Sequence, residues 1–175
     1  AAGVGPRVRA ITARAMNDEL DFEAALLARM ALLKDLPESV LNDVLHSHIT
    51  HTPGGRILVA TMRYHGAHTA LVSGGFTAFS GPVAAALGFD EHRANQLIIK
   101  DGKLTGEVVR PILGRQAKID ALEEIAARLG LRVSDVMAVG DGANDLGMLG
   151  RAGAGVALHA KPAVAAECDL RINHA

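Results

Sequence analysis

The sequence predicts an α/β protein whose parallel sheet is covered by helices on both faces. Short apolar runs alternate along the chain with segments in which apolar residues recur every three or four positions. Many of the 19 glycines follow directly after such an apolar run. In open α/β folds the ligand binds at this edge of the sheet, where strands end and helices begin.

The first quarter of the chain has a helical pattern and no strand pattern. Asp21 suits the N-cap of a helix whose apolar residues recur at three- and four-residue steps, namely Phe22, Ala25, Leu26, Met30 and Leu33. Pro37 suits the first turn of a further helix that runs to about Leu45. We therefore expect residues 1–47 to form a helical cap and residues 48–175 to form the α/β core.

The core is expected to begin with a helix and then a strand. Thr52 and Pro53 supply a cap and a first-turn proline for a helix that ends near Gly66. An apolar strand at 69–72 then leads into Ser-Gly-Gly and a helix that closes at Gly88.

The second half continues the alternation. Asp101-Gly102 is a strong signal for a two-residue turn, so the segments 96–100 and 103–109 are expected to form a hairpin. The remaining predicted elements are a helix at 117–129, a strand at 136–139, a helix from about Asn144, and strands at 155–158 and 169–172.

Composition excludes several classes of protein. The 18 Lys and Arg residues nearly cancel the 19 Asp and Glu residues, so no basic field is present for a nucleic-acid backbone. No apolar run is long enough to span a bilayer. The single cysteine, Cys168, excludes an internal disulfide and suits a reducing compartment. We expect a cytoplasmic protein without nucleic-acid or membrane partners, with Cys168 buried or inert.

Two carboxylates follow the predicted strand at 136–139. Asp141 comes at its carboxyl edge, and Asp145 follows on the first turn of the next helix with Asn144 beside it. Hard oxygen ligands of this kind suit Mg²⁺, which usually takes one or two carboxylates together with waters and a phosphate. The alternative is that Asp141 and Asn144 only cap the helix.

Two further segments carry residues suited to phosphate. The hydroxyl of Ser73, the N–H groups of Gly74 and Gly75 and the following helix N-terminus form a candidate anion site. The alternative is an ordinary strand-to-helix turn. Lys118, on the helix after the hairpin, has an ammonium that suits a transferring phosphoryl group, although a helix lysine is more often a solvated surface residue.

Other candidates carry less. His46, His48 and His51 match no standard zinc spacing, so a solvated linker is favoured there. No G-x-x-x-x-G-K-[ST] segment is present, which excludes an ordinary P-loop nucleotide site.

Taken in order, three of these segments resemble the later motifs of the haloacid dehalogenase (HAD) superfamily: Ser73 the second, Lys118 the third and GDGAND the fourth. The detail is similar to the phosphoserine phosphatase family in VSGGF (72–76), DGKLTGEV (101–108), AVGDGANDLGML (138–149), AKP (160–162) and ALLKDLP (31–37). The resemblance implies a HAD-like doubly wound parallel sheet, a helical cap inserted after its first strand, and a β-hairpin.

The resemblance also implies roles for individual residues. Asp141 would be a Mg²⁺ ligand and Asp145 would orient the shell of the metal. The phosphoryl group would be held by Ser73, Gly74, Lys118 and Asn144.

In the cap, Met16 and Phe22 match apolar positions that close over the substrate, although simple helix packing is the alternative for both. Arg29 matches an arginine that grips the carboxylate of serine, a task suited to a bidentate guanidinium.

One motif of the family is absent. D-x-D-x-[ST], which supplies the nucleophile and the general acid, occurs nowhere in the 175 residues, and we expect it upstream of Ala1 on the first strand. The parent protein is then expected to convert O-phospho-L-serine and water into L-serine and phosphate for serine biosynthesis, through an aspartyl-phosphate. The 175 residues alone are expected to be inactive and incomplete at both ends. Alternatives are a HAD phosphatase or phosphotransferase for another small phosphomonoester, or a non-catalytic phosphate-binding relative. A homodimer stays open.

Overall fold

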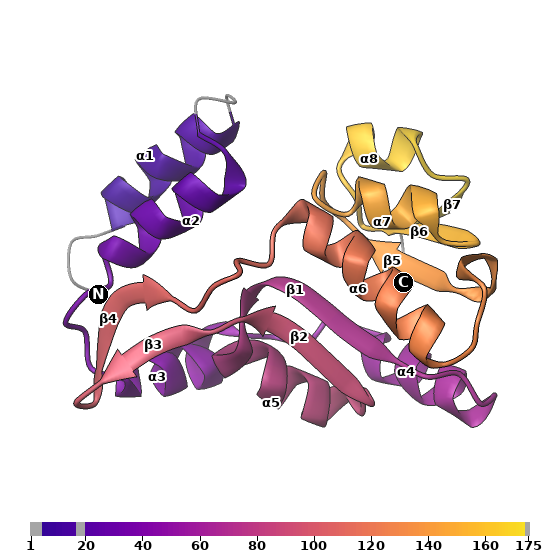
Figure 1. The fold of residues 1–175 in the computed structure, drawn as a ribbon, viewed down its shortest axis with the longest axis horizontal. Coiled ribbons are helices and arrows are strands. Elements are labelled where there is room, and N and C mark those ends of the chain that lie inside the picture. Colours follow the sequence, from indigo (N-terminus) through magenta and orange to yellow (C-terminus); the bar gives the residue numbers. More distant parts are fainter. Residues whose placement is uncertain (1–4, 17–19, 174–175) are drawn as a thin grey trace. The chain divides into compact units, whose positions relative to one another are not determined.

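The computed structural model describes residues 5–16 and 20–173, and the chain divides into two compact units, residues 1–112 and 113–175 (Figure 1). Each unit contains parallel strands joined through helices, so the predicted α/β fold class is confirmed. The parallel strands of the described residues form two sheets, one in each unit. The expected division into a cap at 1–47 and a core at 48–175 stays a prediction.

The first unit opens with four helices, α1 (Gly5–Met16), α2 (Phe22–Ala31), α3 (Ser39–His48) and α4 (Gly55–Tyr64). The Asp21 carboxylate accepts a hydrogen bond of 2.6 Å from the Ala24 N–H, as expected of the N-cap. The linker expected around His46 is wrong, because α3 continues through these residues to His48.

Two of these helices begin later than their prolines suggested. Pro37 lies before α3 and bridges to Lys103, and Pro53 lies before α4. Gly54, with φ 78°, is the N-cap of α4. A turn of left-handed backbone therefore separates the Thr52-Pro53 signal from the helix.

The sheet of the first unit pairs β1 (Ala70–Phe76) in parallel with β2 (Glu91–Asn95). Helix α5 (Thr77–Leu87) connects these strands and packs against both (Figure 1). The predicted strand was too short, because β1 runs on through Ser73 to Phe76 with an irregular register after Val72. The polar strand β2 was not predicted.

The predicted hairpin is confirmed by β3 (Leu97–Lys100) and β4 (Lys103–Val108), which pair antiparallel. Asp101 and Gly102 have φ values of 52° and 72°, as a type I′ turn requires. Helix α2 packs on β4 around the buried residues Leu26, Met30 and Val108. At the positive-φ residue Gly106, an added Cβ would come within 3.1 Å of the Lys34 Cβ, so only glycine lets the strand approach this closely.

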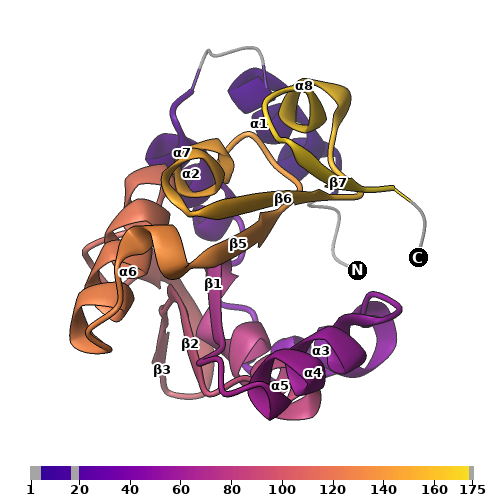
Figure 2. The same ribbon diagram turned by 90° about the vertical axis from the view of Figure 1, so that its right-hand side faces the viewer.

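The second unit is a three-stranded parallel sheet with helices against it (Figure 2). Its strands, in spatial order, are β5 (Met137–Gly140), β6 (Ala154–Leu158) and β7 (Leu170–Ile172). Its helices are α6 (Arg115–Arg128), the 3-10 turn η1 (Val133–Asp135), α7 (Leu146–Arg151) and α8 (Pro162–Ala166).

The core of this unit is built from small and aliphatic side chains and includes Cys168, a buried free thiol as expected. Among the helices of the described ranges, none has the length and apolar character needed to cross a membrane.

Candidate functional site

In the first unit, Ser73 lies in the irregular part of β1. Its Oγ accepts a hydrogen bond of 3.0 Å from the Gly75 N–H. A hydroxyl that accepts such a bond keeps its own hydrogen for another acceptor. Within the described part of the chain no acceptor for that hydrogen is found. Ser73 is therefore free to donate to a ligand oxygen.

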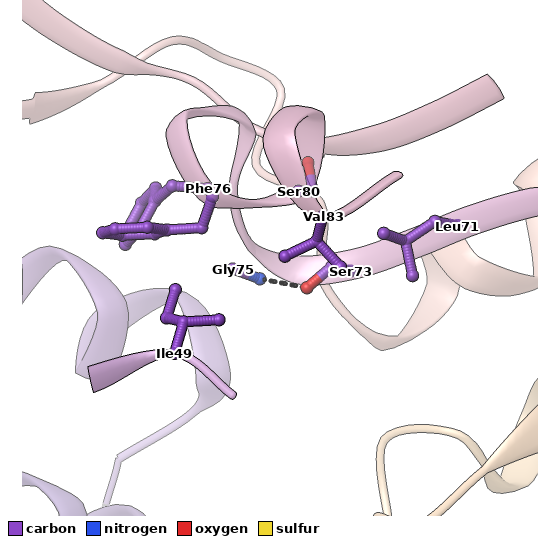
Figure 3. Close-up of a pocket in the computed structure, with 8 residues that line it drawn as sticks. Ile49, Leu71, Ser73, Gly75, Phe76, Ser80 and Val83 are labelled. Carbon is purple, nitrogen blue, oxygen red and sulfur yellow. Dashed lines mark hydrogen bonds between the residues drawn. The ribbon is translucent and has the colours of Figure 1, made fainter. Parts of the chain in front are cut away.

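Ser73 also lines a cavity of about 260 Å³ (Figure 3). Figure 3 shows the serine Oγ and the Gly75 nitrogen joined by a dashed line beside the side chains of Ile49 and Val83. Apart from Ser73, Gly75 and Ser80, the lining is apolar. A bond from the Ser73 hydroxyl to a ligand is stronger here than in open water, because the local dielectric is low.

The helix N-terminus expected beside this serine is not there. Helix α5 begins only at Thr77, with Phe76 as its N-cap residue. The two glycines let β1 continue instead of turning into the helix, and they carry the irregular register. The hydroxyl and the Gly75 N–H thus remain as the polar groups of this segment.

In the second unit, Lys118 of α6 and Asp145 form a buried ion pair. The residues are only 8% and 4% exposed, so the surface-lysine alternative is wrong. Asp145 lies at the N-cap of α7, not in its first turn. Burial at both ends makes this pair a fixed part of the site.

The backbone completes the coordination of the Asp145 carboxylate. Its Oδ2 accepts hydrogen bonds from the Asp141 N–H at 3.3 Å and the Gly142 N–H at 3.0 Å. A Cβ on Gly140 would lie 2.6 Å from the Asp145 Cβ, so the glycine leaves the space into which this side chain fits. The carboxylate is thereby committed to Lys118 and to the turn after β5.

Asp141 differs from Asp145 in every respect. It is exposed at the carboxyl end of β5, and across the described ranges its carboxylate has no hydrogen-bonding or ionic partner. The half-buried Asn144 is three residues further on. The two carboxylates therefore have different tasks, one structural and one available to a ligand.

This donor set fits a magnesium ion better than zinc. Over the residues that the structure describes, no group of three or more His, Cys, Asp or Glu side chains could hold a metal. Zinc needs such a set, whereas Mg²⁺ keeps several waters and needs only one or two carboxylates besides a phosphate. The free Asp141 carboxylate meets the second requirement.

The cap residues predicted by resemblance belong to α1 and α2. Phe22 is half-buried and packs against the cluster of Leu26, Met30 and Val108, as the helix-packing alternative holds. Arg29 is half-buried, and in the described structure no carboxylate pairs with its guanidinium. Met16 ends α1, but its side chain lies outside the described part. Contact of these three residues with a substrate stays a prediction.

The structure also shows a residue that the sequence reasoning missed. Asn95 of β2 is 2% exposed, and its Nδ2 donates a 3.0 Å hydrogen bond to the Gly74 carbonyl. No strand was predicted at 91–95, because EHRAN lacks the alternation and β-branched residues of a typical strand. The one available signal was an uncharged polar residue directly before the apolar run at 97–99.

The site residues thus fall into two groups. Ser73 and Gly74 lie in the first unit with the cap residues, and Lys118, Asp141, Asn144 and Asp145 lie in the second. Each group is built at the carboxyl end of a parallel strand, where α/β proteins bind ligands.

The class of protein follows from a match to known families. The family model of the haloacid dehalogenase-like hydrolases matches residues 1–150, and the chain belongs to this family. Within it, the chain belongs to the phosphoserine phosphatases.

Two curated relatives and one solved structure support this second step. The chain is 43% identical over 173 residues to a phosphoserine phosphatase of Mycobacterium tuberculosis, covering 99% of this chain and 42% of the relative. It is 42% identical over 171 residues to the phosphoserine phosphatase of Methanocaldococcus jannaschii, covering 98% of this chain and 81% of the relative.

The solved structure is described as a phospho-aspartyl intermediate analogue of phosphoserine phosphatase. It is 41% identical, with a TM-score of 0.89 over 99% of this chain and 82% of that one. The chain spans about half or less of the length of the first relatives that it matches.

Proposed function

We propose that the full natural protein hydrolyses O-phospho-L-serine to L-serine and phosphate. The observation that carries the proposal is the division of labour between two carboxylates four residues apart. Asp145 is buried against Lys118, while Asp141 is exposed and unpaired at the end of β5. A phosphatase needs such a free carboxylate for its metal and a fixed cation beside the phosphate. The phosphoserine phosphatases among the relatives supply the substrate class.

Ser73, Gly74 and Lys118 hold the phosphoryl group in this proposal. The Ser73 hydroxyl supplies a neutral donor whose hydrogen has no other acceptor, and Lys118 supplies positive charge. Asn144 adds a donor on the turn after β5. Donors fixed before the substrate arrives stabilise developing charge without reorganisation.

Mg²⁺ is the proposed cofactor. Asp141 would hold it, and Asp145 would orient the turn through the Asp141 and Gly142 N–H groups. When bound, the ion supplies a Lewis acid that neutralises charge on the phosphoryl oxygens.

The proposed chemistry passes through an aspartyl-phosphate. An aspartate oxygen forms a bond to phosphorus as the serine oxygen leaves and takes a proton from a general acid; water then cleaves the acyl phosphate to phosphate and the aspartate. The 175 residues contain no D-x-D, so they should not turn over phosphoserine by themselves. Comparing phosphate release by these residues and by the full natural protein tests this point, and equal rates would refute it.

Arg29 is the proposed reader of the serine carboxylate, because its half-buried guanidinium has no carboxylate partner in the described residues. Arg29→Ala should lower kcat/KM of the full protein for phosphoserine by about 100-fold, since a charged hydrogen-bonded pair is lost. O-Phosphoethanolamine has no carboxylate, so its kcat/KM should change by less than about 3-fold.

The matched control is Arg56→Ala, which removes an exposed arginine of α4 in the same unit. It should leave both substrates unaffected. Equal losses for the two substrates in Arg29→Ala would instead favour a phosphatase for another phosphomonoester.

Serine biosynthesis in the cytoplasm is the proposed setting. The reaction yields serine, and the single buried free thiol of Cys168 suits a reducing compartment.

A further inference from the structure

The Ser-Gly-Gly segment of β1 needs an anchor from outside itself. Glycine is the most permissive residue, and two in succession leave the peptide between them free to rotate. The register of β1 with β2 is irregular between Val72 and Phe76, so the ladder does not fix this peptide either. Something else must set the direction in which its polar groups point.

Asn95 of β2 makes that contact. Its Nδ2 donates to the Gly74 carbonyl at 3.0 Å, and the residue is 2% exposed. Phe76 is the register partner of Asn95, so the side chain reaches back along β1 to the glycines. Water has no access to replace this bond if the amide is removed.

The contact has a direct consequence for Ser73. The Gly74 carbonyl and the Gly75 N–H belong to one planar peptide unit, in which they point in opposite directions. Holding the carbonyl toward Asn95 therefore turns the Gly75 N–H away from it, and this N–H donates to the Ser73 Oγ at 3.0 Å (Figure 3). Hydrogen bonds linked in such a chain also polarise one another.

We infer that Asn95 is a positioning residue for phosphoryl binding: through the Gly74–Gly75 peptide it holds the Ser73 Oγ as an acceptor, so that the serine hydroxyl donates into the cavity. Ser80 and the apolar lining residues have no contact with this peptide group that would do the same. The inference rests on the proposed function in one respect, namely that Ser73 binds the phosphoryl group.

A double-mutant cycle tests the inference in the full natural protein, with phosphoserine and Mg²⁺. Asn95→Leu keeps the approximate size of the side chain but removes the donor, and it should lower kcat/KM by about 10-fold or more. In a Ser73→Ala background the same change should cost less than about 2-fold, because the hydroxyl through which Asn95 acts is gone. If Asn95→Leu does not fold, Asn95→Asp, which keeps the shape, is measured in both backgrounds under the same criterion.

Thr69→Val is the matched control. Thr69 is also buried in this strand pair, but its hydroxyl bonds Asp90 at the opposite end of β1. Its loss should change kcat/KM by less than about 2-fold. An equal effect of Asn95→Leu with and without Ser73, or an effect no larger than that of Thr69→Val, would overturn the inference.

A spectroscopic readout separates this inference from the proposed function. In the full protein labelled with ¹⁵N-glycine, the Gly75 amide proton should shift upfield in Ser73→Ala and also in the Asn95 variant, since both lose the same bond. An unchanged Gly75 resonance in the Asn95 variant would refute the inference even if phosphoserine is hydrolysed. If the wild-type protein releases no phosphate, the proposed function fails, and the Gly75 resonance still decides the role of Asn95.

Discussion

At the scale of single residues, the ion pair between Lys118 and Asp145 shows most clearly what sequence alone leaves undecided. A lysine on a helix is usually exposed, and nothing in RQAKIDAL indicates that Lys118 is buried. Its burial depends on Asp145, which is 27 residues further along the chain. The motifs predicted that both residues belong to a site, but only the fold shows that they neutralise each other.

Breaking this pair should destabilise the protein strongly. Lys118→Met leaves the Asp145 carboxylate buried with only backbone donors, so the free energy of unfolding should fall by about 3–5 kcal/mol. Lys118→Met combined with Asp145→Asn should cost less than the sum of the single changes. Urea unfolding measures all three variants.

The exposed pair between Arg151 and Glu123 is the control for this prediction. Both side chains are largely exposed, so Arg151→Gln should cost less than about 1 kcal/mol. Similar losses for Arg151→Gln and Lys118→Met would contradict the structural role given to the buried pair.

Asp90 gives the first unit an acid-sensitive contact. Hydrogen bonds from the Thr69 backbone and hydroxyl, and the nearby Arg63, lower the pKa of Asp90 below its ordinary value of 3.8. A lowered pKa stabilises the fold above 3.8, and this contribution is lost as the pH falls through the pKa of the folded state. Asp90→Asn should therefore lose less stability than the wild type between about pH 6 and about pH 3.

Urea midpoints at the two pH values measure this difference. Thr69→Val removes the hydroxyl bond to Asp90 while keeping the backbone bond, so its pH dependence should fall between those of the wild type and Asp90→Asn. Identical pH dependence in the wild type and Asp90→Asn would show that Asp90 contributes nothing to acid sensitivity.

At the scale of elements, strong local signals predicted the structure well. Asp101-Gly102 predicted the hairpin because a type I′ turn requires positive φ at two successive residues. The polar strand β2 was missed because it is stabilised by pairing with β1, which no local pattern encodes. The same pairing extends β1 beyond its apolar run, through Ser73 to Phe76.

The hairpin and the cap helix α2 should depend on the absence of a side chain at Gly106. Gly106→Ala places a residue at φ 83°, which costs about 1–2 kcal/mol, and it also brings a Cβ within 3.1 Å of Lys34 and 3.3 Å of the Met30 carbonyl. The loss in the free energy of unfolding should therefore exceed that of conformational strain alone.

Gly102→Ala separates these two costs. Gly102 has φ 72°, but an added Cβ there would meet nothing within 4 Å. Its loss should be that of strain alone, about 1–2 kcal/mol. If the two variants unfold at the same urea concentration, the close approach of β4 to α2 contributes nothing.

At the scale of the whole molecule, the family and fold class could be predicted because Ser73, Lys118 and GDGAND occur in order over an alternating α/β pattern. Which carboxylate is free could not be predicted, because Asp141 and Asp145 lie in the same motif and differ only in burial and partners. Asn95 escaped prediction for a similar reason, since its role is visible only once β2 lies beside β1.

The central claim is that the natural protein carrying this sequence is a Mg²⁺-dependent phosphoserine phosphatase with Ser73 in its phosphoryl site. The most direct measurement is phosphate release from O-phospho-L-serine by the full protein, with Mg²⁺ and with a chelator, for the wild type and Ser73→Ala. We predict release that requires the metal and falls by about 10-fold or more in Ser73→Ala, since a hydrogen bond to the charged phosphoryl group is lost. No phosphate release by the folded wild-type protein, or equal release by both proteins, would contradict the claim.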